Sequence, residues 1–262
     1  MSRQNYYKTR KVRKRKSVDE SLVGELVRQE RAIQPRLGGL KLHYMLKREL
    51  EEAGVPMGRD RFFEVLKNKD LLLERRSKAP KTTNSRHSLP LFENLIKDLT
   101  PGQANEIWVS DITYIRISDA FAYLSLITDK CSRKIVGWHL GRTMTTEDTL
   151  EALDMALCEL PKGITPIHHS DRGCQYCSHE YVNRLKSAGL TISMTEVDHC
   201  AENALAERVN GILKDEYFLD VCFGSFGEAK KAVEEAIKCY NNRRPHRSLS
   251  MKTPVQVHAK AA

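Results

Sequence analysis

One aspartate stands in a stretch where a carboxylate is costly. Asp111 lies in WVSDITYIRI, residues 108–117, whose branched and aromatic residues are typical of a β-strand. Side chains of a strand alternate between its two faces, so Asp111 shares a face with apolar neighbours such as Val109 and Ile115. A carboxylate in an apolar row is unfavourable unless it is paired or bound to a metal ion. The chemistry expected at Asp111 is therefore ion pairing or metal binding.

Two further acids complete a possible set. Asp171 follows a strand-like stretch in ITPIHHSDRG, at the kind of strand end where sites of α/β sheets assemble. Glu207 follows Asp171 after 35 intervening residues, in the helical pattern ENALAERVNGILKDEY. Taken singly, each acid also has an ordinary structural explanation, because strand edges, turns and solvated helix faces all carry acidic residues. It is their order and spacing together that indicates a site.

The region that carries these acids has the pattern of an α/β domain. Three strands with short connections come first, and helices and strands then alternate, which predicts a mixed sheet with flanking helices. The expected strands cover residues 107–117, 121–128, 134–140, 164–169 and 190–194, and the expected helices cover 146–160, 178–188, 202–219 and 226–241.

The first part of the chain differs from the α/β region in its charge and in its residue pattern. Residues 1–100 hold 24 Lys and Arg against 13 Asp and Glu, which favours a polyanionic partner such as nucleic acid. The first 16 residues include eight basic and no acidic ones, and we expect a disordered arm there, followed by a helix to residue 34. Helical patterns at 41–54 and 59–72, joined by the turn AGVPMG, resemble a helix-turn-helix, although a plain helical hairpin fits the same pattern.

These observations predict four segments. We expect a basic arm and N-terminal helix over residues 1–35 and a helix-turn-helix-like domain over 36–76. A polar linker would follow over 77–101, and the α/β domain would occupy 102–262. The chain has seven cysteines, no long apolar run and no signal-peptide pattern, which indicates a cytoplasmic protein with reduced thiols.

Several long motifs occur in one order along the chain. They are W-x-x-D-I-T-Y around Asp111, H-S-D-R-G-x-Q-Y around Asp171, the N-A-x-x-E helix of Glu207, and YNNRRPHRSLSMKTPVQV over residues 240–257. Together they resemble the DDE transposase/integrase superfamily, and within it the second-frame (OrfB-type) transposases of the bacterial insertion-sequence-3 family. The resemblance covers residues 36–258.

The resemblance implies a fold and a metal site. The catalytic domain would have an RNase H-like fold, in which Asp111, Asp171 and Glu207 converge on two Mg²⁺ ions, for which Mn²⁺ can substitute. Such a pair of ions can stabilise both the attacking and the leaving oxygen of an in-line displacement at phosphorus. Asp111 would then be tolerated in its apolar row because a dication lies beside it.

Further residues are expected near DNA. Lys214, Asn203, Gln175 and His169 flank the acids, and their alternative roles are a solvated lysine, a helix cap and loop supports. Basic residues on the second helix of the helix-turn-helix-like pattern and near the C-terminus would contact the DNA backbone; they are Arg59, Arg61, Lys67, Lys69, Arg243, Arg244 and Arg247, together with His246.

Two ambiguities concern the metal ligands. Family members usually have Asp before the Asn-Ala pair, and here the residue is Glu202, which could be mistaken for the third acid; the spacing from Asp171 favours Glu207. Cys174 and Cys177 have the spacing of zinc ligands, and His199 with Cys200 would supply a second pair only awkwardly. Incidental thiols are the simpler interpretation.

The resemblance implies a DNA transposase that cleaves and joins strands at the inverted repeats ending its own element. Such enzymes usually act as homo-oligomers on DNA, and in many relatives the active form is a frameshift fusion with an upstream-frame (OrfA-type) product. Two rivals remain: an RNase H-like nuclease without strand transfer, and a non-catalytic DNA-binding regulator or relic of a transposon. The intact acidic set argues against a relic, and the helical front region argues against a simple nuclease.

Overall fold

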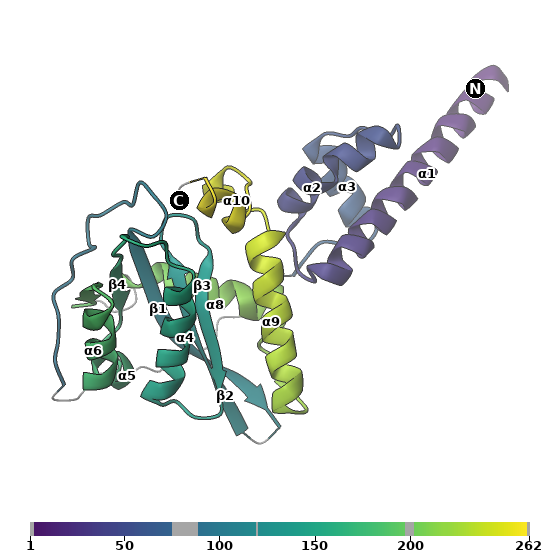
Figure 1. Ribbon diagram of the computed structural model, residues 1–262. Helices are drawn as coiled ribbons and strands as arrows, with labels where there is room; N and C mark the ends of the chain where they lie inside the picture. Colours follow the sequence, from purple (N-terminus) through teal and green to yellow (C-terminus); the bar gives the residue numbers. More distant parts are fainter. Residues whose placement is uncertain (1–2, 75–88, 119, 197–201, 261–262) are drawn as a thin grey trace. The chain divides into compact units, whose positions relative to one another are not determined.

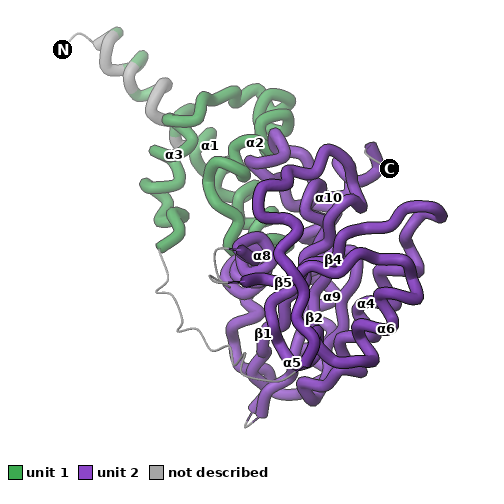
Figure 2. The backbone as a smooth tube through the Cα atoms, turned by 90° about the vertical axis from the view of Figure 1, so that its left-hand side faces the viewer, with its two compact units in different colours: residues 1–77 green, residues 78–262 purple. Residues whose placement is uncertain are grey.

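The computed structural model describes the chain except for residues 1–2, 75–88, 119, 197–201 and 261–262 (Figure 1). The chain divides into two compact units, residues 1–77 and 78–262 (Figure 2). The described elements of the first unit are all helices, and all the described strands belong to the second. None of the described helices is both long and apolar enough to cross a membrane.

The first unit contains helices α1 (Arg3–Ile33), α2 (Gly39–Glu52) and α3 (Arg59–Asn68). Its core consists of apolar side chains from all three helices, including Val27, Leu46 and Phe62. The expectation of a disordered basic arm was wrong, because α1 begins at Arg3 and runs through the basic stretch. Lys, Arg and Gln favour helix, and the stretch lacks Gly and Pro, so the helix continues through it.

Helices α2 and α3 end in the same way. Gly54 and Asp70 adopt positive φ angles of 72° and 53°. After each of them, the next backbone N–H donates to a carbonyl five residues earlier, Leu50 O and Leu66 O. This is the Schellman geometry, which stops a helix because one residue turns left-handed. It explains why α3 ends at Asn68 rather than at the expected residue 72.

The second unit is built on one mixed sheet (Figure 1). Its strands are β1 (Ile107–Ile117), β2 (Ala120–Asp129), β3 (Ile135–Gly141), β4 (Ile167–Ser170), β5 (Thr191–Met194) and β6 (Cys222–Phe223). The order is β3-β2-β1-β4-β5, with β6 paired to the far end of β1. β1, β2 and β3 form an antiparallel meander, and β4, β5 and β6 run parallel to their neighbours. The expected mixed α/β sheet is confirmed.

The fourth strand begins later than the sequence suggested. It was expected from residue 164, but the ladder starts at Ile167, whose N–H donates to Glu106 O at 2.9 Å. The preceding residue is Pro166, which has no N–H to offer to a neighbouring strand.

Helices cover both faces of the sheet. One face carries Trp108, Ile127 and Val136 against the first group of helices, and the other carries Ile115 and Leu124 against the second group. The first group comprises α4 (Thr146–Cys158), α5 (Cys174–Cys177) and α6 (His179–Ser187), and the second comprises α8 (Ala204–Glu216) and α9 (Phe226–Asn242). Because strand side chains alternate, Asp111 points to the α8 side, directly beside Leu126 of β2.

Part of the expected linker belongs to the sheet unit. The linker was expected over residues 77–101, and the structure describes this range from residue 89 onward. There, Ile96 is buried against β1, and the N–H of Leu95 donates to Ser193 Oγ at 2.9 Å. The polar composition concealed a few apolar residues that are sufficient to hold this segment against the sheet.

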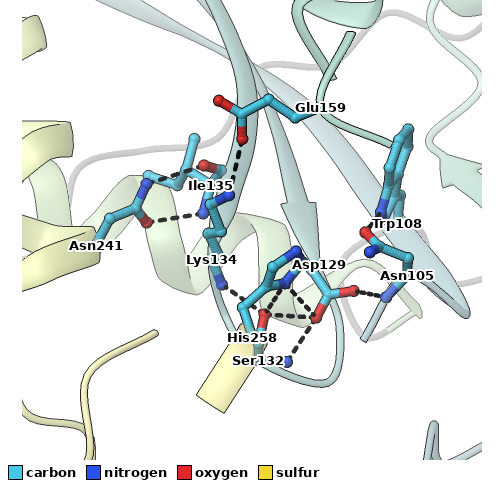
Figure 3. A network of polar contacts seen from close by, with 9 residues as sticks. All are labelled: Asn105, Trp108, Asp129, Ser132, Lys134, Ile135, Glu159, Asn241 and His258. Carbon is cyan, nitrogen blue, oxygen red and sulfur yellow. Dashed lines mark hydrogen bonds and ion pairs between the residues drawn. The ribbon is translucent and has the colours of Figure 1, made fainter. Parts of the chain in front are cut away.

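A polar network fastens the C-terminal segment to the turn between β2 and β3 (Figure 3). The fully buried carboxylate of Asp129 accepts hydrogen bonds from the backbone N–H groups of Asn105 and Ser132 and from Ser132 Oγ. His258, at the end of α10 (Pro254–His258), places Nδ1 3.0 Å from the same Ser132 Oγ. A buried carboxylate with several donors is well satisfied, so this end of the sheet is stable.

Asn241 of α9 fastens the same region from the other side. Its Oδ1 accepts from Ile135 N and its Nδ2 donates to Ile135 O, both at 2.9 Å (Figure 3). The side chain therefore pairs with the first residue of β3 as a further strand would.

We expect Asn241→Ala to lower the free energy of unfolding of the sheet unit by about 1–3 kcal/mol, since it leaves two buried backbone groups unpaired. Asn242→Ala is the matched control, because Asn242 is exposed and bonds only within its own helix, to Lys238 O. Both tryptophans of the chain, Trp108 and Trp138, lie in the sheet unit, so fluorescence during urea unfolding reports on that unit. Equal stability of the two variants would contradict the prediction.

Candidate active site

The parallel pairing of β1 with β4 brings two acids to one edge. The paired residues are few, ending with Val109 opposite His169. Two positions further along each chain come Asp111 and Asp171. Beyond this point β1 next pairs on that side at Arg116, with β6. Within the described part of the chain, residues 110–115 therefore have no strand on that side, and Asp111 and Asp171 lie at this opening.

Asp171 begins a tight turn. Its Oδ1 accepts a hydrogen bond from Gly173 N at 3.0 Å, which is the geometry of an Asx turn. A Cβ at position 173 would lie 3.0 Å from the same oxygen, so the turn is compact enough to favour glycine. The short helix α5 starts at the next residue. The turn thus fixes the carboxylate of Asp171 at the end of β4.

Helix α8 supplies the third acid and two amides. Its apolar side, with Val209 and Leu213, is buried in the core. On another side, Asn210 Nδ2 donates to Asp111 Oδ2 at 2.8 Å. At the start of the helix, Asn203 Nδ2 donates to Ser110 O at 2.9 Å. These two amides fasten α8 to β1, and Glu207 lies between them along the helix.

The charges at this edge act on one another. The pKa of the Asp111 carboxyl is raised to about 7, first because burial penalises the charged form and next because Asp171 carries a like charge nearby. Glu207 adds a smaller repulsion, and the hydrogen bond from Asn210 acts in the opposite direction. The three acids therefore share one electrostatic neighbourhood in which negative charge is in excess.

The donor set fits a hard divalent cation. Carboxylate oxygens are the ligands that Mg²⁺ prefers, and nearby positive charge would relieve the repulsion that raises the Asp111 pKa. Among the described residues, no three Asp, Glu, His or Cys side chains lie close enough to hold one ion in common. Mg²⁺ is usually held by one or two carboxylates with water and substrate oxygens, so pairs that share Asp111 suffice.

Lys214, also on α8, lies on the far side of the acids from Asn203. Its Nζ is 4.1 Å from the centre of the Tyr114 ring, a cation–π contact. Burial lowers its pKa, and the charges of Asp111 and Asp220 oppose that change. The side chain is thus held beside the acidic edge rather than freely solvated.

Two other residues expected near DNA are buried. His169 is fully buried, and its Nδ1 lies 2.9 Å from Ser193 Oγ of β5. Burial lowers the pKa of His169 to about 4, which keeps the ring neutral at pH 7. Gln175 is buried, and its Nε2 donates to Met144 O at 2.9 Å. Of the two roles considered for these residues, the geometry favours support of the loop around Asp171.

The C-terminal basic cluster divides into two kinds of residue. Arg244 was expected to contact DNA, but its side chain is buried and forms a bidentate pair with Glu216 of α8, at 2.8 and 2.7 Å. Its Nη1 also lies 3.0 Å from Nε2 of the buried His246. The expectation for Arg244 was therefore wrong, because its charge is used inside the fold. Arg243 and Arg247 remain exposed.

The basic residues of α3 lie on the surface of the helical unit. Arg61 and Lys67 are exposed, and Lys69, just after the helix, is partly buried. Arg59 is exposed and pairs with its neighbour Asp60 at 2.8 Å. Arg61 and Lys67 therefore remain the residues of this helix best placed to meet a phosphate.

Glu202 and the cysteine pair were the alternative metal ligands, and the structure gives them other surroundings. Glu202 accepts a hydrogen bond from the backbone N–H of Glu196, and it is Glu207 that contributes to the Asp111 pKa. Cys177 is buried, with its Sγ 3.7 Å from Met194 Sδ, whereas Cys174 is exposed. His199 and Cys200 lie outside the described residues.

Sequence reasoning did not assign a role to two residues that hold the site. For Asn210, the available signal was its place one turn after Glu207 in the helical pattern. Glu216 gave no signal, because its partner Arg244 lies 28 residues away along the chain.

Fold and site together define a class. An RNase H-like mixed sheet with acids at the edge of its first strand is the core of DDE-type transposases and integrases, which cleave and join DNA strands. Models of the integrase core domain match residues 101–200 and 188–254. The chain is 36% identical to the insertion element IS600 uncharacterized 31 kDa protein of Shigella sonnei, over 82% of this chain and 80% of that protein. It is 33% identical to transposase InsF for insertion sequence IS3A of Escherichia coli, over 76% and 69% of the two chains.

The chain belongs to the insertion-sequence-3 family of DNA transposases. A solved structure of the simian T-cell lymphotropic virus intasome agrees on the fold, with a TM-score of 0.53 at 21% identity over 84% of this chain and 74% of that chain. The expected fold and enzyme class are thereby confirmed.

We expect Asp111→Asn to stabilise the metal-free sheet unit at pH 8. The folded-state pKa of Asp111, about 7, lies above the ordinary value of 3.8, so the folded protein holds this proton more tightly than the unfolded chain does. The free energy of unfolding of the wild-type sheet unit should therefore fall by an amount on the order of 2–4 kcal/mol as pH rises from about 4 to about 7. Urea unfolding in EDTA at pH 4.5 and pH 8 measures this. A wild type that is at least as stable as the variant at pH 8 would overturn it.

We expect Arg244→Met to lower the free energy of unfolding by about 2–4 kcal/mol, because it leaves the partly buried carboxylate of Glu216 without its partner. Arg243→Met, a change at the exposed neighbouring residue, is the matched control and should cost less than about 0.5 kcal/mol. If Arg244→Met instead weakened DNA binding while leaving stability unchanged, the side chain would be a DNA contact after all.

Proposed function

We propose that Asp111, Asp171 and Glu207 hold two Mg²⁺ ions, for which Mn²⁺ can substitute, and that this site cleaves and joins DNA strands at the ends of an insertion sequence. The observation that carries the proposal is the placement of Asp111 and Asp171 at the opening where β4 ends, with Glu207 on the adjacent helix α8. Burial and then the like charge of Asp171 raise the pKa of Asp111 to about 7, which a cation would relieve. Integrase core domains are metal-dependent, in line with this donor set. When bound, the metal ions lower the pKa of an attacking hydroxyl and stabilise the leaving oxygen.

The residues of the chain position these ligands. Asn210 Nδ2 donates to Asp111 Oδ2 and so fixes the orientation of this carboxylate. The Asx turn at Gly173 fixes Asp171, and α8 fixes Glu207. Lys214 lies beside this edge, where its ammonium group can pair with a phosphate of the bound strand. Rigid placement of this kind lets a site act without rearrangement during the reaction.

The reaction needs no covalent protein intermediate. In cleavage, a water oxygen forms a bond to phosphorus while the bond from phosphorus to the 3′-oxygen breaks, which frees a 3′-OH. In joining, that 3′-OH forms the new bond to a target phosphate, and the target's own 3′-oxygen leaves. The same acids serve both steps because both are in-line displacements at phosphorus.

The proposed partners are inferred from the exposed basic residues of the chain and from its similarity to transposases. The helical unit, with the exposed Arg61 and Lys67, would bind the terminal inverted repeats, and Arg243 and Arg247 would contact backbone phosphates. A homo-oligomer would hold two element ends together, and an upstream-frame product would complete the active form. The relatives are named as transposases, which favours strand transfer over a simple nuclease or a regulator.

The test is nicking and joining of a labelled DNA that carries the end of the element, with Mg²⁺. We expect Asp171→Asn and Glu207→Gln to reduce both activities by about a hundredfold or more, because each removes a charged ligand. Glu202→Gln is the matched control, and it should retain most of the activity. If Glu202→Gln is inactive and Glu207→Gln is active, the third acid has been assigned to the wrong residue.

A further inference from the structure

Beside the acidic edge lies an open cavity of about 380 Å³. Its walls come from the β1–β2 hairpin and from the end of α8 with the residues that follow it. The lining residues are Tyr114, Arg116, Phe121, Lys214, Leu219 and Asp220. None of them is needed to hold the proposed metal ions, so the cavity calls for a separate explanation.

Two aromatic rings of this cavity face solvent. Tyr114 is 40% exposed and Phe121 is 49% exposed. Their ring centres are 5.5 Å apart at an interplanar angle of 84°. In the strand register Phe121 lies opposite Arg116, and Tyr114 lies two residues before Arg116, so all three share one face of the hairpin. Exposed aromatic pairs are unfavourable in water, and they mark surfaces that receive a partner.

Two cations border the rings and are held in place. Lys214 Nζ lies 4.1 Å from the centre of the Tyr114 ring, and Arg116 Nη2 donates to the backbone oxygen of Asp220 at 2.9 Å. Both side chains thus keep fixed positions while leaving further donors available to a ligand. Aromatic faces flanked by fixed cations are the arrangement by which proteins bind unpaired nucleotides.

The cavity adjoins the proposed active site through Lys214, which lines the cavity and interacts electrostatically with Asp111. Tyr114 lies three residues after Asp111 on the part of β1 that has no strand partner on one side in the described chain. Lys214 lies about two turns after Glu207 on α8. A nucleotide next to the reacting phosphate would therefore reach this surface. The cavity is also of the size that receives a small ligand rather than a protein face.

We propose that this surface binds an unpaired DNA nucleotide next to the reacting phosphate, with the base stacked on Phe121 and Tyr114 and the phosphate paired with Lys214 and Arg116. This inference rests on the proposed function, because it is the acidic edge that makes DNA the ligand. It adds that the enzyme recognises a frayed or single-stranded end, and not only a duplex.

The test uses the whole 262-residue chain without metal, so that binding is measured apart from catalysis. The probe is an oligonucleotide duplex with a three-nucleotide single-stranded 3′ extension that contains 2-aminopurine, whose fluorescence is quenched on stacking. A blunt duplex is the second probe. Fluorescence anisotropy gives the affinity of each probe, and 2-aminopurine emission reports stacking.

We expect Phe121→Ala to weaken binding of the extended probe about tenfold and to abolish the quenching, with little change for the blunt duplex. Phe121→Trp should restore both, because any aromatic face can stack. Met155→Ala on α4 is the matched control, since Met155 is exposed to a similar extent, 41%, but lies away from the cavity. Tryptophan fluorescence and urea unfolding verify that each variant is folded.

The outcomes separate this proposal from the proposed function. Equal binding and quenching by Phe121→Ala and Met155→Ala would overturn the nucleotide site, as would a wild type that shows no quenching. A wild type that quenches through Phe121 but neither nicks nor joins DNA with Mg²⁺ would keep the site and overturn the strand-transfer function.

Discussion

The brief parallel contact between β1 and β4 is the constraint on which the rest of the active-site edge depends. Parallel strands place their carboxyl ends together, and here the pairing stops two residues before Asp111 and Asp171. An ordinary sheet would continue the ladder and cover this position with a neighbouring strand. Because β4 ends at Ser170, the backbone of β1 is left open beside two carboxylates, and a ligand can approach them.

The second half of the site must then be supplied by a helix. Helix α8 is fastened to β1 by Asn203 and Asn210, which meet Ser110 O and Asp111 Oδ2. It is also fastened from the C-terminal segment, where Arg244 pairs with Glu216. The C-terminal sequence signature over residues 240–257 therefore acts largely inside the fold, where Arg244 pairs with Glu216 of α8 and Asn241 pairs with β3. His258, directly after the signature, contacts the network around Asp129. The pair of Arg244 with Glu216 helps to hold the helix that carries Glu207.

This architecture concentrates negative charge at an unfavourable place. Burial and this excess of like charge raise the Asp111 pKa, so the metal-free protein is less stable near neutral pH than at acidic pH. The same strand and helix carry the exposed ring of Tyr114 and the cation of Lys214, with Phe121 on the neighbouring strand β2. The proposed metal ligands and the proposed nucleotide site thus share strand β1 and helix α8.

The sequence by itself determined the kind of fold, the order of most elements and the acids, because strand alternation, helical spacing and the length of the motifs are local properties of the chain. It placed Asp111 on an apolar strand face and Glu207 in a helix, and the structure agrees on both. Only the tertiary structure decided what distant segments do to a residue. In the folded chain Arg244 is buried against Glu216, whereas Arg243 is exposed. His169 and Gln175 are buried beside the turn at Asp171, and Lys214 lies over the ring of Tyr114. Ile96, from the expected linker, packs against β1. The physical reason is that burial and ion pairing depend on which segments meet in space. The sequence around a residue does not indicate which partners, tens of residues away, will contact it.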